Sequence, residues 1–354
     1  MVRLEFYSIR PGPDGLTHHS LPVTHFWIAR MLFWLTPAAA TTAWLLWYML
    51  KVPGVSYAGA LKPLSADEKL IAGNLRGHVE AIASREHNVF RSAELEASAR
   101  YVEKTFARLG YAVAAQRFQS GQVEVRNIEV EVRGGTRASE IVLVGAHYDS
   151  AAGAVGANDN GSGVAAMLEL ARLLKEANPT RTLRFVAFVN EEAPFYRSDA
   201  MGSRHYARRS KERGENIIAM FSLETIGYYS DQPGSQRYPF PLGLFYPASG
   251  NFVAFVSNLG SRALLHEALA SFRRHAGIPS EGLAAPALIP GVDWSDHWSF
   301  WQAGWPALMV TDTALYRYPY YHTMQDTLDK VDYERLARVV AGLHGMLRDL
   351  AQTR

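Results

Sequence analysis

The sequence of 354 residues contains no cysteine. This absence excludes disulfide scaffolds, thiolate zinc sites and cysteine nucleophiles. Any metal ion would have to be held by histidine, aspartate and glutamate. The absence leaves the compartment open, because many exported proteins need no disulfide.

The chain also has little excess charge. Lysine and arginine total 36 against 34 acidic residues, which gives a formal net charge of +2. So small a surplus gives no support for a nucleic-acid partner, which normally requires a concentrated basic patch. Hydrophobic residues make up 48% and charged residues 20%, so a packed core is possible and wholesale disorder is excluded.

One long run near the N-terminus has no charge at all, from Met31 to Leu50. As a helix it would be roughly 30 Å long, which matches the hydrocarbon core of a bilayer. The run is rich in rings that favour membrane interfaces, at Trp34, Trp44, Trp47 and Tyr48, with Trp27 just before it. We expect a single-pass, uncleaved anchor in the lipid bilayer at 31–50, after an N-terminal tail at 1–30. The alternatives are a buried core helix and a cleavable signal peptide, and the flanking charges do not decide the orientation.

The rest of the chain reads as a linker at 51–65 and one domain at 66–352. Ser65 to Glu68 resembles a helix start. Short β-rich runs then alternate with helical stretches, which predicts an α/β fold whose central sheet is mixed but largely parallel, with helices on both faces. The strands are expected at 123–132, 141–145, 183–189, 217–223 and 307–311, and the helices at 95–109, 164–176, 204–213, 261–275 and 333–350.

Polar residues follow several of these strands, at the edge where α/β sheets bind ligands. His147 and Asp149 follow the second predicted strand, and Glu191 and Glu192 follow the third. Each feature alone has an ordinary explanation, such as a buried histidine or a helix start. Together with Glu224, with His322 after the last strand and with Asp159 in a glycine-rich loop, they supply the nitrogen and oxygen ligands of a cysteine-free zinc site.

Six motifs occur in a fixed order: GAHYDS, GANDNGSG, NEEAP, SLETIGY, SDHWSFW and YYHTMQDTLDK. As an ordered set they resemble the co-catalytic di-zinc aminopeptidases, which are family twenty-eight of the metallopeptidases, with relatives among the glutamate carboxypeptidases and glutaminyl cyclases. The resemblance covers about residues 66 to 352 and implies a zinc peptidase domain with two zinc ions per chain.

The resemblance also implies the role of each residue. His147 and Glu224 would hold one zinc, Glu192 and His322 the other, and Asp159 would bridge them. Glu191 would be the general base, Tyr321 a phenol that helps to polarise the scissile carbonyl, and Asp149 the carboxylate that orients His147. The peptide bond Asp159–Asn160 would be cis. Many relatives have aspartate where this chain has Glu224, so the longer side chain would alter denticity or spacing at that zinc.

The expected function is a membrane-anchored, zinc-dependent aminopeptidase that acts on peptides, with its catalytic part outside the cytoplasm. The alternatives are a carboxypeptidase, a single-zinc glutaminyl cyclase and a non-catalytic, receptor-like relative. An aromatic cluster from Trp294 to Trp305, with Tyr316, Tyr318 and Tyr320, suggests an apolar specificity pocket. The sequence does not determine the preferred side chain or the oligomeric state.

Overall fold

The computed structural model describes residues 23–352, with side chains from residue 34 onward. Contacts within the chain divide it into two units, Met1–Tyr48 and Met49–Arg354. Most of the predicted tail at 1–30 lies outside the described residues.

The uncharged run at 31–50 is helical, as expected, and lies within the longer helix α1 (Val23–Leu50). However, no helix in the described part of the chain is both long enough and apolar enough to cross a membrane. The prediction of a membrane-spanning helix at Met31–Leu50 is therefore not supported. The run lacks charge, but its hydropathy is lowered by residues that are less apolar than leucine, namely Thr36, Pro37, Thr41, Thr42 and Tyr48.

The predicted linker has no helix or strand between residues 51 and 65, yet it is held against the domain. Ser56 Oγ accepts a hydrogen bond from the backbone N–H of Ser280 at 2.8 Å. The guanidinium of Arg273 donates to the carbonyl of Pro53 at 2.9 Å. This segment is thus part of the folded domain rather than a free connection.

The domain is built on an eight-stranded mixed sheet with the order β1-β2-β4-β3-β5-β8-β6-β7. The neighbouring strands β4, β3, β5 and β8 are parallel, β6 runs antiparallel to β8, and β7 runs parallel to β6. The five predicted strands are confirmed, whereas β1, β6 and β7 were not predicted. The bounds are β1 (Ala114–Ser120), β2 (Val123–Val132), β3 (Arg137–His147), β4 (Arg181–Phe188), β5 (Asn216–Glu224), β6 (Val253–Ser257), β7 (Ser280–Ala284) and β8 (Ala307–Thr311).

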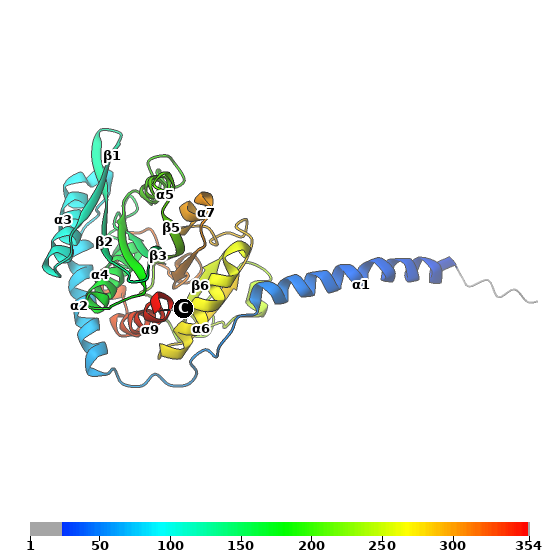
Figure 1. The fold of residues 1–354 in the computed structure, drawn as a ribbon. Coiled ribbons are helices and arrows are strands. Elements are labelled where there is room, and N and C mark those ends of the chain that lie inside the picture. Colours follow the sequence, from blue (N-terminus) through cyan, green and yellow to red (C-terminus); the bar gives the residue numbers. More distant parts are fainter. Residues whose placement is uncertain (1–22, 353–354) are drawn as a thin grey trace, which may run out of the picture. The chain divides into compact units, whose positions relative to one another are not determined.

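Helices cover both faces of this sheet, as expected (Figure 1). One face carries α2 (Ala66–Ile82), α3 (Ser92–Arg108), α4 (Gly163–Leu174), α6 (Arg262–His275) and α9 (Tyr333–Gln352). The other carries α5 (Gly202–Glu212) and α7 (His297–Ala303), and the short helix α8 (Ala314–Arg317) follows β8. The predicted helix start is also confirmed, because Ser65 Oγ accepts from the N–H of Glu68 while the Glu68 carboxylate accepts from the N–H of Ser65.

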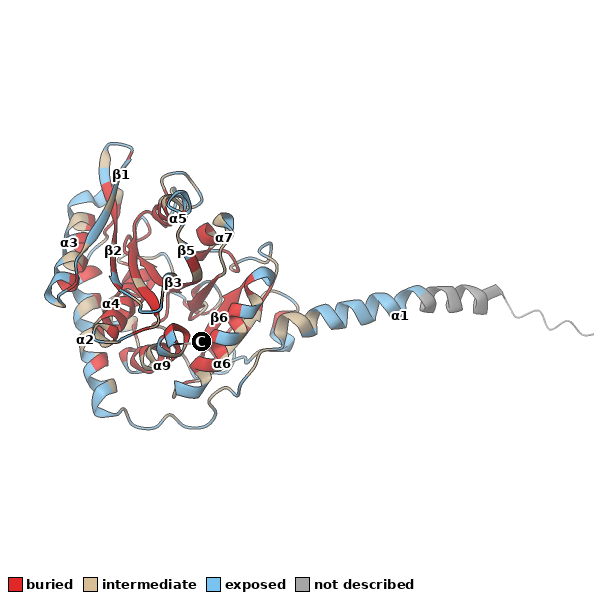
Figure 2. Cartoon of the chain, viewed as in Figure 1, coloured by how far each residue is buried: buried red, intermediate tan, exposed pale blue. Residues whose placement is uncertain are grey.

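Buried residues concentrate in the sheet and on the sides of the helices that face it (Figure 2). β3 is buried from Ile141 to its end and most of β5 is buried, because both of their faces are covered. Their parallel register aligns Gly145 with Ser222. The residues that end these strands therefore meet at one edge of the sheet.

Candidate metal centre

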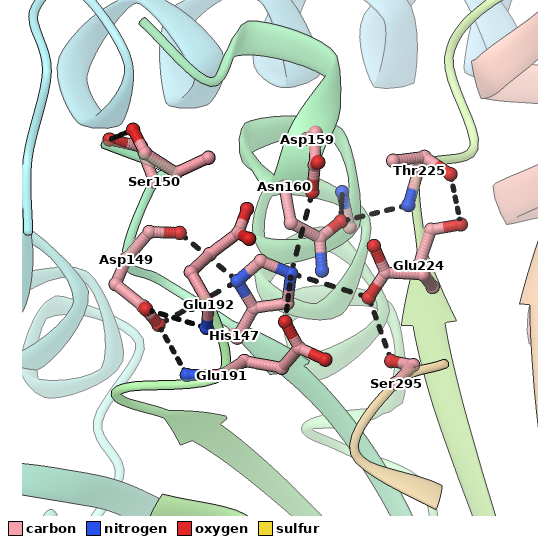
Figure 3. A network of polar contacts seen from close by, with 12 residues as sticks. His147, Asp149, Ser150, Asp159, Asn160, Glu191, Glu192, Glu224, Thr225 and Ser295 are labelled. Atoms are coloured by element: carbon pink, nitrogen blue, oxygen red, sulfur yellow. Dashed lines mark hydrogen bonds and ion pairs between the residues drawn. The ribbon is translucent and has the colours of Figure 1, made fainter. Parts of the chain in front are cut away.

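Six of the sequence-predicted site residues lie together at this edge in Figure 3, namely His147, Asp149, Asp159, Glu191, Glu192 and Glu224. His147 is the last residue of β3 and Glu224 the last of β5. Glu191 and Glu192 follow the end of β4 directly after Val189 and Asn190. Each of these side chains is thus placed by the end of a buried strand.

Two further residues reach the cluster from loops. Asp159 lies in the turn Ala157–Ser162 before α4, and its peptide bond to Asn160 is cis, as the resemblance implies. The Asn160 side chain ties this turn to β5, because its amide donates to the carbonyl of Leu223 at 2.8 Å. His322 follows α8 and has a positive φ of 56°, a conformation that non-glycine residues adopt mainly where the surroundings enforce it.

The carboxylate of Asp159 lies between two imidazoles. Its Oδ1 is 3.5 Å from His147 Nε2, and its Oδ2 is 3.0 Å from His322 Nε2. A second carboxylate accompanies each ring: Glu224 Oε2 lies 3.3 Å from His147 Nε2, and Glu192 Oε2 lies 3.2 Å from His322 Nε2. The cluster therefore consists of two imidazole–carboxylate pairs that share one central carboxylate.

Several atoms of this cluster have no hydrogen-bond partner in the described part of the chain, although they are buried. They are His147 Nε2, both carboxylate oxygens of Asp159 and Glu192 Oε1. Buried polar atoms are normally paired, because leaving them unpaired is costly. One ligand atom each from His147, Asp159 and Glu192 lies within 4.8 Å of the others. The donors thus fit a cation that prefers nitrogen and oxygen ligands, such as zinc.

The electrostatics of the cluster also favour a cation. Burial opposes a charged imidazole, but the carboxylates of Asp159 and Glu192, 3.0 Å and 3.2 Å from the ring nitrogen, raise the pKa of His322 to about 11. Burial, followed by repulsion from Asp159, raises the pKa of Glu192 to about 7. The cluster therefore binds protons strongly because its carboxylates lie close together and need positive charge beside them. A bound metal ion would supply that positive charge instead.

His147 is oriented by the backbone of Asp149. The His147 Nδ1–H donates to the Asp149 carbonyl at 3.0 Å, which leaves Nε2 facing the cluster. The Asp149 carboxylate lies 3.6 Å from the same Nδ1, which is long for a hydrogen bond. This carboxylate instead accepts from the backbone N–H groups of Glu191 at 3.1 Å and Glu192 at 3.2 Å. Asp149 therefore positions the acidic pair as well as the imidazole.

Glu191 and Tyr321 border the cluster. Glu191 Oε2 lies 3.9 Å from His147 Nε2. Burial raises the pKa of Glu191 well above its usual range, which suits a group that accepts a proton. The ring of Tyr321 stacks on His322 with centroids 3.8 Å apart. Burial, followed by nearby carboxylates, raises the pKa of Tyr321, so its phenol keeps its proton at neutral pH.

Two supporting residues carried no predicted role. Asp326 accepts from the backbone N–H groups of Asn158 at 2.8 Å and Asp159 at 3.0 Å. Ser295 Oγ donates to Glu224 Oε2 at 2.7 Å. Both residues lie inside recognised motifs, YYHTMQDTLDK and SDHWSFW, but neither spacing nor residue type indicated what they contact.

The predicted aromatic cluster is dispersed in the structure. Trp301 and Trp305 pack against the core beside α7. Trp294 and Tyr316 line a pocket next to the metal centre. Tyr318 instead donates to Asp326 at 2.6 Å.

The chain is similar in sequence or fold to several known proteins. The chain is 38% identical over 262 residues to the uncharacterized protein YfbL of Escherichia coli, covering 72% of this chain and 80% of that protein. It is 30% identical over 207 residues to aminopeptidase YwaD of Bacillus subtilis, covering 56% of this chain but only 38% of YwaD. Its fold is similar to that of BSAP, a zinc aminopeptidase from Bacillus subtilis, with a TM-score of 0.63 at 18% identity over 82% of this chain and 97% of that one.

The profile of peptidase family M28 matches residues 127–346, a stretch that runs from β2 into α9 and contains every residue of the cluster. The chain belongs to peptidase family M28.

Proposed function

We propose that the chain is a zinc-dependent aminopeptidase that removes N-terminal residues from peptides and holds two zinc ions. The observation that carries this proposal is the position of Asp159, whose two carboxylate oxygens face His147 and His322 separately. The names of relatives add support, since they include aminopeptidase YwaD and the zinc aminopeptidase BSAP.

In this proposal, His147 and Glu224 would hold one ion, Glu192 and His322 would hold the other, and Asp159 would be shared by both. The three carboxylates offset much of the positive charge of two divalent ions. When bound, the zinc ions would polarise the scissile carbonyl and lower the pKa of water at the site.

The remaining residues handle protons and orientation. Glu191 takes a proton from the attacking water and later returns it to the leaving amine. The Tyr321 phenol, which keeps its proton at neutral pH, donates to the oxygen of the scissile carbonyl as negative charge develops there. Asp149 fixes both the ring of His147 and the backbone of Glu191, so it keeps the proposed base at a constant position relative to the proposed ligands.

Zinc stoichiometry and a substrate panel test this function together. Elemental analysis of the purified protein should give two zinc ions per chain. Aminoacyl substrates should be hydrolysed, whereas substrates with a blocked N-terminus should not. One zinc ion per chain with conversion of N-terminal glutamine would identify a glutaminyl cyclase. Hydrolysis confined to the C-terminal residue would identify a carboxypeptidase, and two zinc ions without any turnover would point to a non-catalytic relative.

The location outside the cytoplasm, which the resemblance implies, is also a proposal. Protease should digest the catalytic domain in intact cells if the domain is extracellular, and in spheroplasts if it is periplasmic. Complete protection of that domain in both intact cells and spheroplasts would contradict this location.

A further inference from the structure

An apolar pocket opens beside the proposed metal centre. Glu224 and Tyr321 form its edge nearest the cluster, and its walls include Phe252, Val256 and Met309. Its cavity volume is about 110 Å³, close to that of a cavity that admits a benzene-sized group. A substrate held at the metal centre would thus have room for one large side chain here.

The floor of the pocket is a row of paired strand residues. Glu224 of β5 pairs with Thr311 of β8. Thr311 pairs with Ala254 of β6, which in turn pairs with Glu281 of β7. Paired residues on neighbouring strands share a face of the sheet, and all four residues line the pocket. Three steps between strands correspond to roughly 14 Å, so the pocket extends from the metal centre to Glu281.

Glu281 is the unusual member of this row. Its carboxylate has no hydrogen bond or ion pair with any residue in the described part of the chain. Burial raises its pKa, and the positive charge of Arg273 only partly opposes this effect. A carboxylate in apolar surroundings is costly unless a cation or a donor meets it.

Arg273 does not fill this role because it is engaged on the other face of β7. Its guanidinium donates to Ser280 Oγ at 3.2 Å, to the Ser280 carbonyl at 2.7 Å and to the carbonyls of Pro53 and Gly54. Successive strand residues point to opposite faces, so the Ser280 side chain lies away from that of Glu281. The carboxylate is left facing the pocket.

We propose that Glu281 makes this chain select substrates whose N-terminal residue is basic, lysine or arginine. This inference rests on the proposed aminopeptidase function and adds the substrate class. The methylene stem of such a side chain would pack against the apolar walls, and its cation would meet Glu281 at the far end. A purely aliphatic residue would fill the walls but leave the carboxylate unpaired.

Two pairs of substrates isolate the charge. Arginyl and citrullinyl amides of one fluorogenic amine have nearly the same shape, as do lysyl and norleucyl amides, and only the first of each pair is cationic. With the full-length, zinc-loaded protein we expect kcat/KM to favour the cationic member by on the order of 30-fold or more, the scale of a desolvated charge pair. Glu281→Gln should bring both ratios close to one.

Glu267→Gln is the matched control, because it makes the same chemical change at an exposed carboxylate on α6 that lies outside this pocket. It should leave both ratios as in the unmodified protein. Ratios near or below one in the unmodified protein, or ratios that survive Glu281→Gln, would overturn the role of Glu281 while leaving the aminopeptidase proposal intact.

A binding measurement covers the case in which no aminoacyl substrate is turned over, an outcome that would refute the proposed function instead. Calorimetric titration with L-arginine and with L-citrulline then decides the inference. Tighter binding of L-arginine that is lost in Glu281→Gln would support the cation site, and equal binding of the two amino acids would reject it.

Discussion

Glu191→Gln is the substitution that best separates catalysis from metal binding. Glu191 is only 8% exposed, and its backbone N–H is held by Asp149. Glutamine has nearly the same size and leaves that backbone hydrogen bond in place, so the fold and the proposed ligands should be preserved. What disappears is a proton acceptor whose oxygen lies 3.9 Å from His147 Nε2.

A general base typically contributes about 10²–10⁴-fold to turnover. At 1.36 kcal/mol for each factor of ten, this corresponds to a barrier that rises by about 3–5 kcal/mol. We expect kcat to fall by that factor while KM changes little, because the proton is transferred only as the water attacks. Zinc content from elemental analysis and the thermal unfolding midpoint should stay close to those of the unmodified protein.

Glu192→Gln provides the matched control, since it makes the same chemical change at the adjacent position. Glu192 Oε2 lies 3.2 Å from His322 Nε2, in the place of a ligand. This variant should lose zinc, and added zinc should restore part of its activity. Near-normal turnover in Glu191→Gln, or a defect that added zinc repairs, would refute the division of roles within this pair.

Three further predictions concern protons and support. With its pKa raised to about 11, His322 is protonated at pH 7.5 without metal, so zinc binding should release at least one proton. A measured enthalpy of zinc binding that does not change with the ionisation enthalpy of the buffer would contradict this prediction. Asp326→Ala leaves the backbone N–H groups of Asn158 and Asp159 without their acceptor, so the free energy of unfolding should fall by roughly 2–4 kcal/mol; unchanged denaturant unfolding would count against it. Hydrogen bonds from Arg126 lower the pKa of Glu96 from 4.5 to about 2, so they stabilise the fold above pH 4.5 and this stabilisation is lost as the pH falls toward 2. Arg126→Met should therefore make the free energy of unfolding less dependent on pH in the acid range. Identical profiles of stability against pH in the variant and the unmodified protein would contradict this prediction.

Two strands have the predicted bounds, for different reasons. β8 (ALMVT) is a continuous apolar run that is buried throughout, whereas β2 (VEVRNIEVEV) is rich in valine and isoleucine that alternate with polar residues over much of its length. β1 could not be predicted in this way, because its sequence AAQRFQS is largely polar and mostly exposed at the edge of the sheet. β7 contains both Glu281 and a glycine, and it is a strand because it pairs with β6 rather than because of its own propensity.

Helix α1 shows the limit of counting charges. An uncharged run of the right length predicts a membrane span only if its residues are also strongly apolar. Threonine, proline, tryptophan and tyrosine are uncharged, but they are not strongly apolar. The helix could therefore be predicted from the sequence, whereas its relation to a membrane could not.

The cluster of site residues could be predicted because each member follows a strand or lies in a recognised loop. Their supports could not, because they act through contacts that leave no pattern in the sequence. Asp326 accepts backbone N–H groups from a turn that precedes it by more than 160 positions. Asp149 contacts its predicted partner His147 mainly through its own carbonyl, while its carboxylate holds the acidic pair.

Glu224 joins the metal centre to the pocket. Its carboxylate lies 3.3 Å from His147 Nε2, while Ser295 Oγ donates to the same oxygen at 2.7 Å and in turn contacts Ser222 Oγ at 2.8 Å. A shorter aspartate would withdraw the carboxylate by roughly one bond length, about 1.5 Å, from both His147 and Ser295. The longer side chain is therefore matched by a hydroxyl that fixes its position. Glu224 also begins the row of paired residues that ends at Glu281. The strand register that places Glu224 beside His147 therefore also fixes how far from the metal centre the carboxylate of Glu281 lies in the pocket.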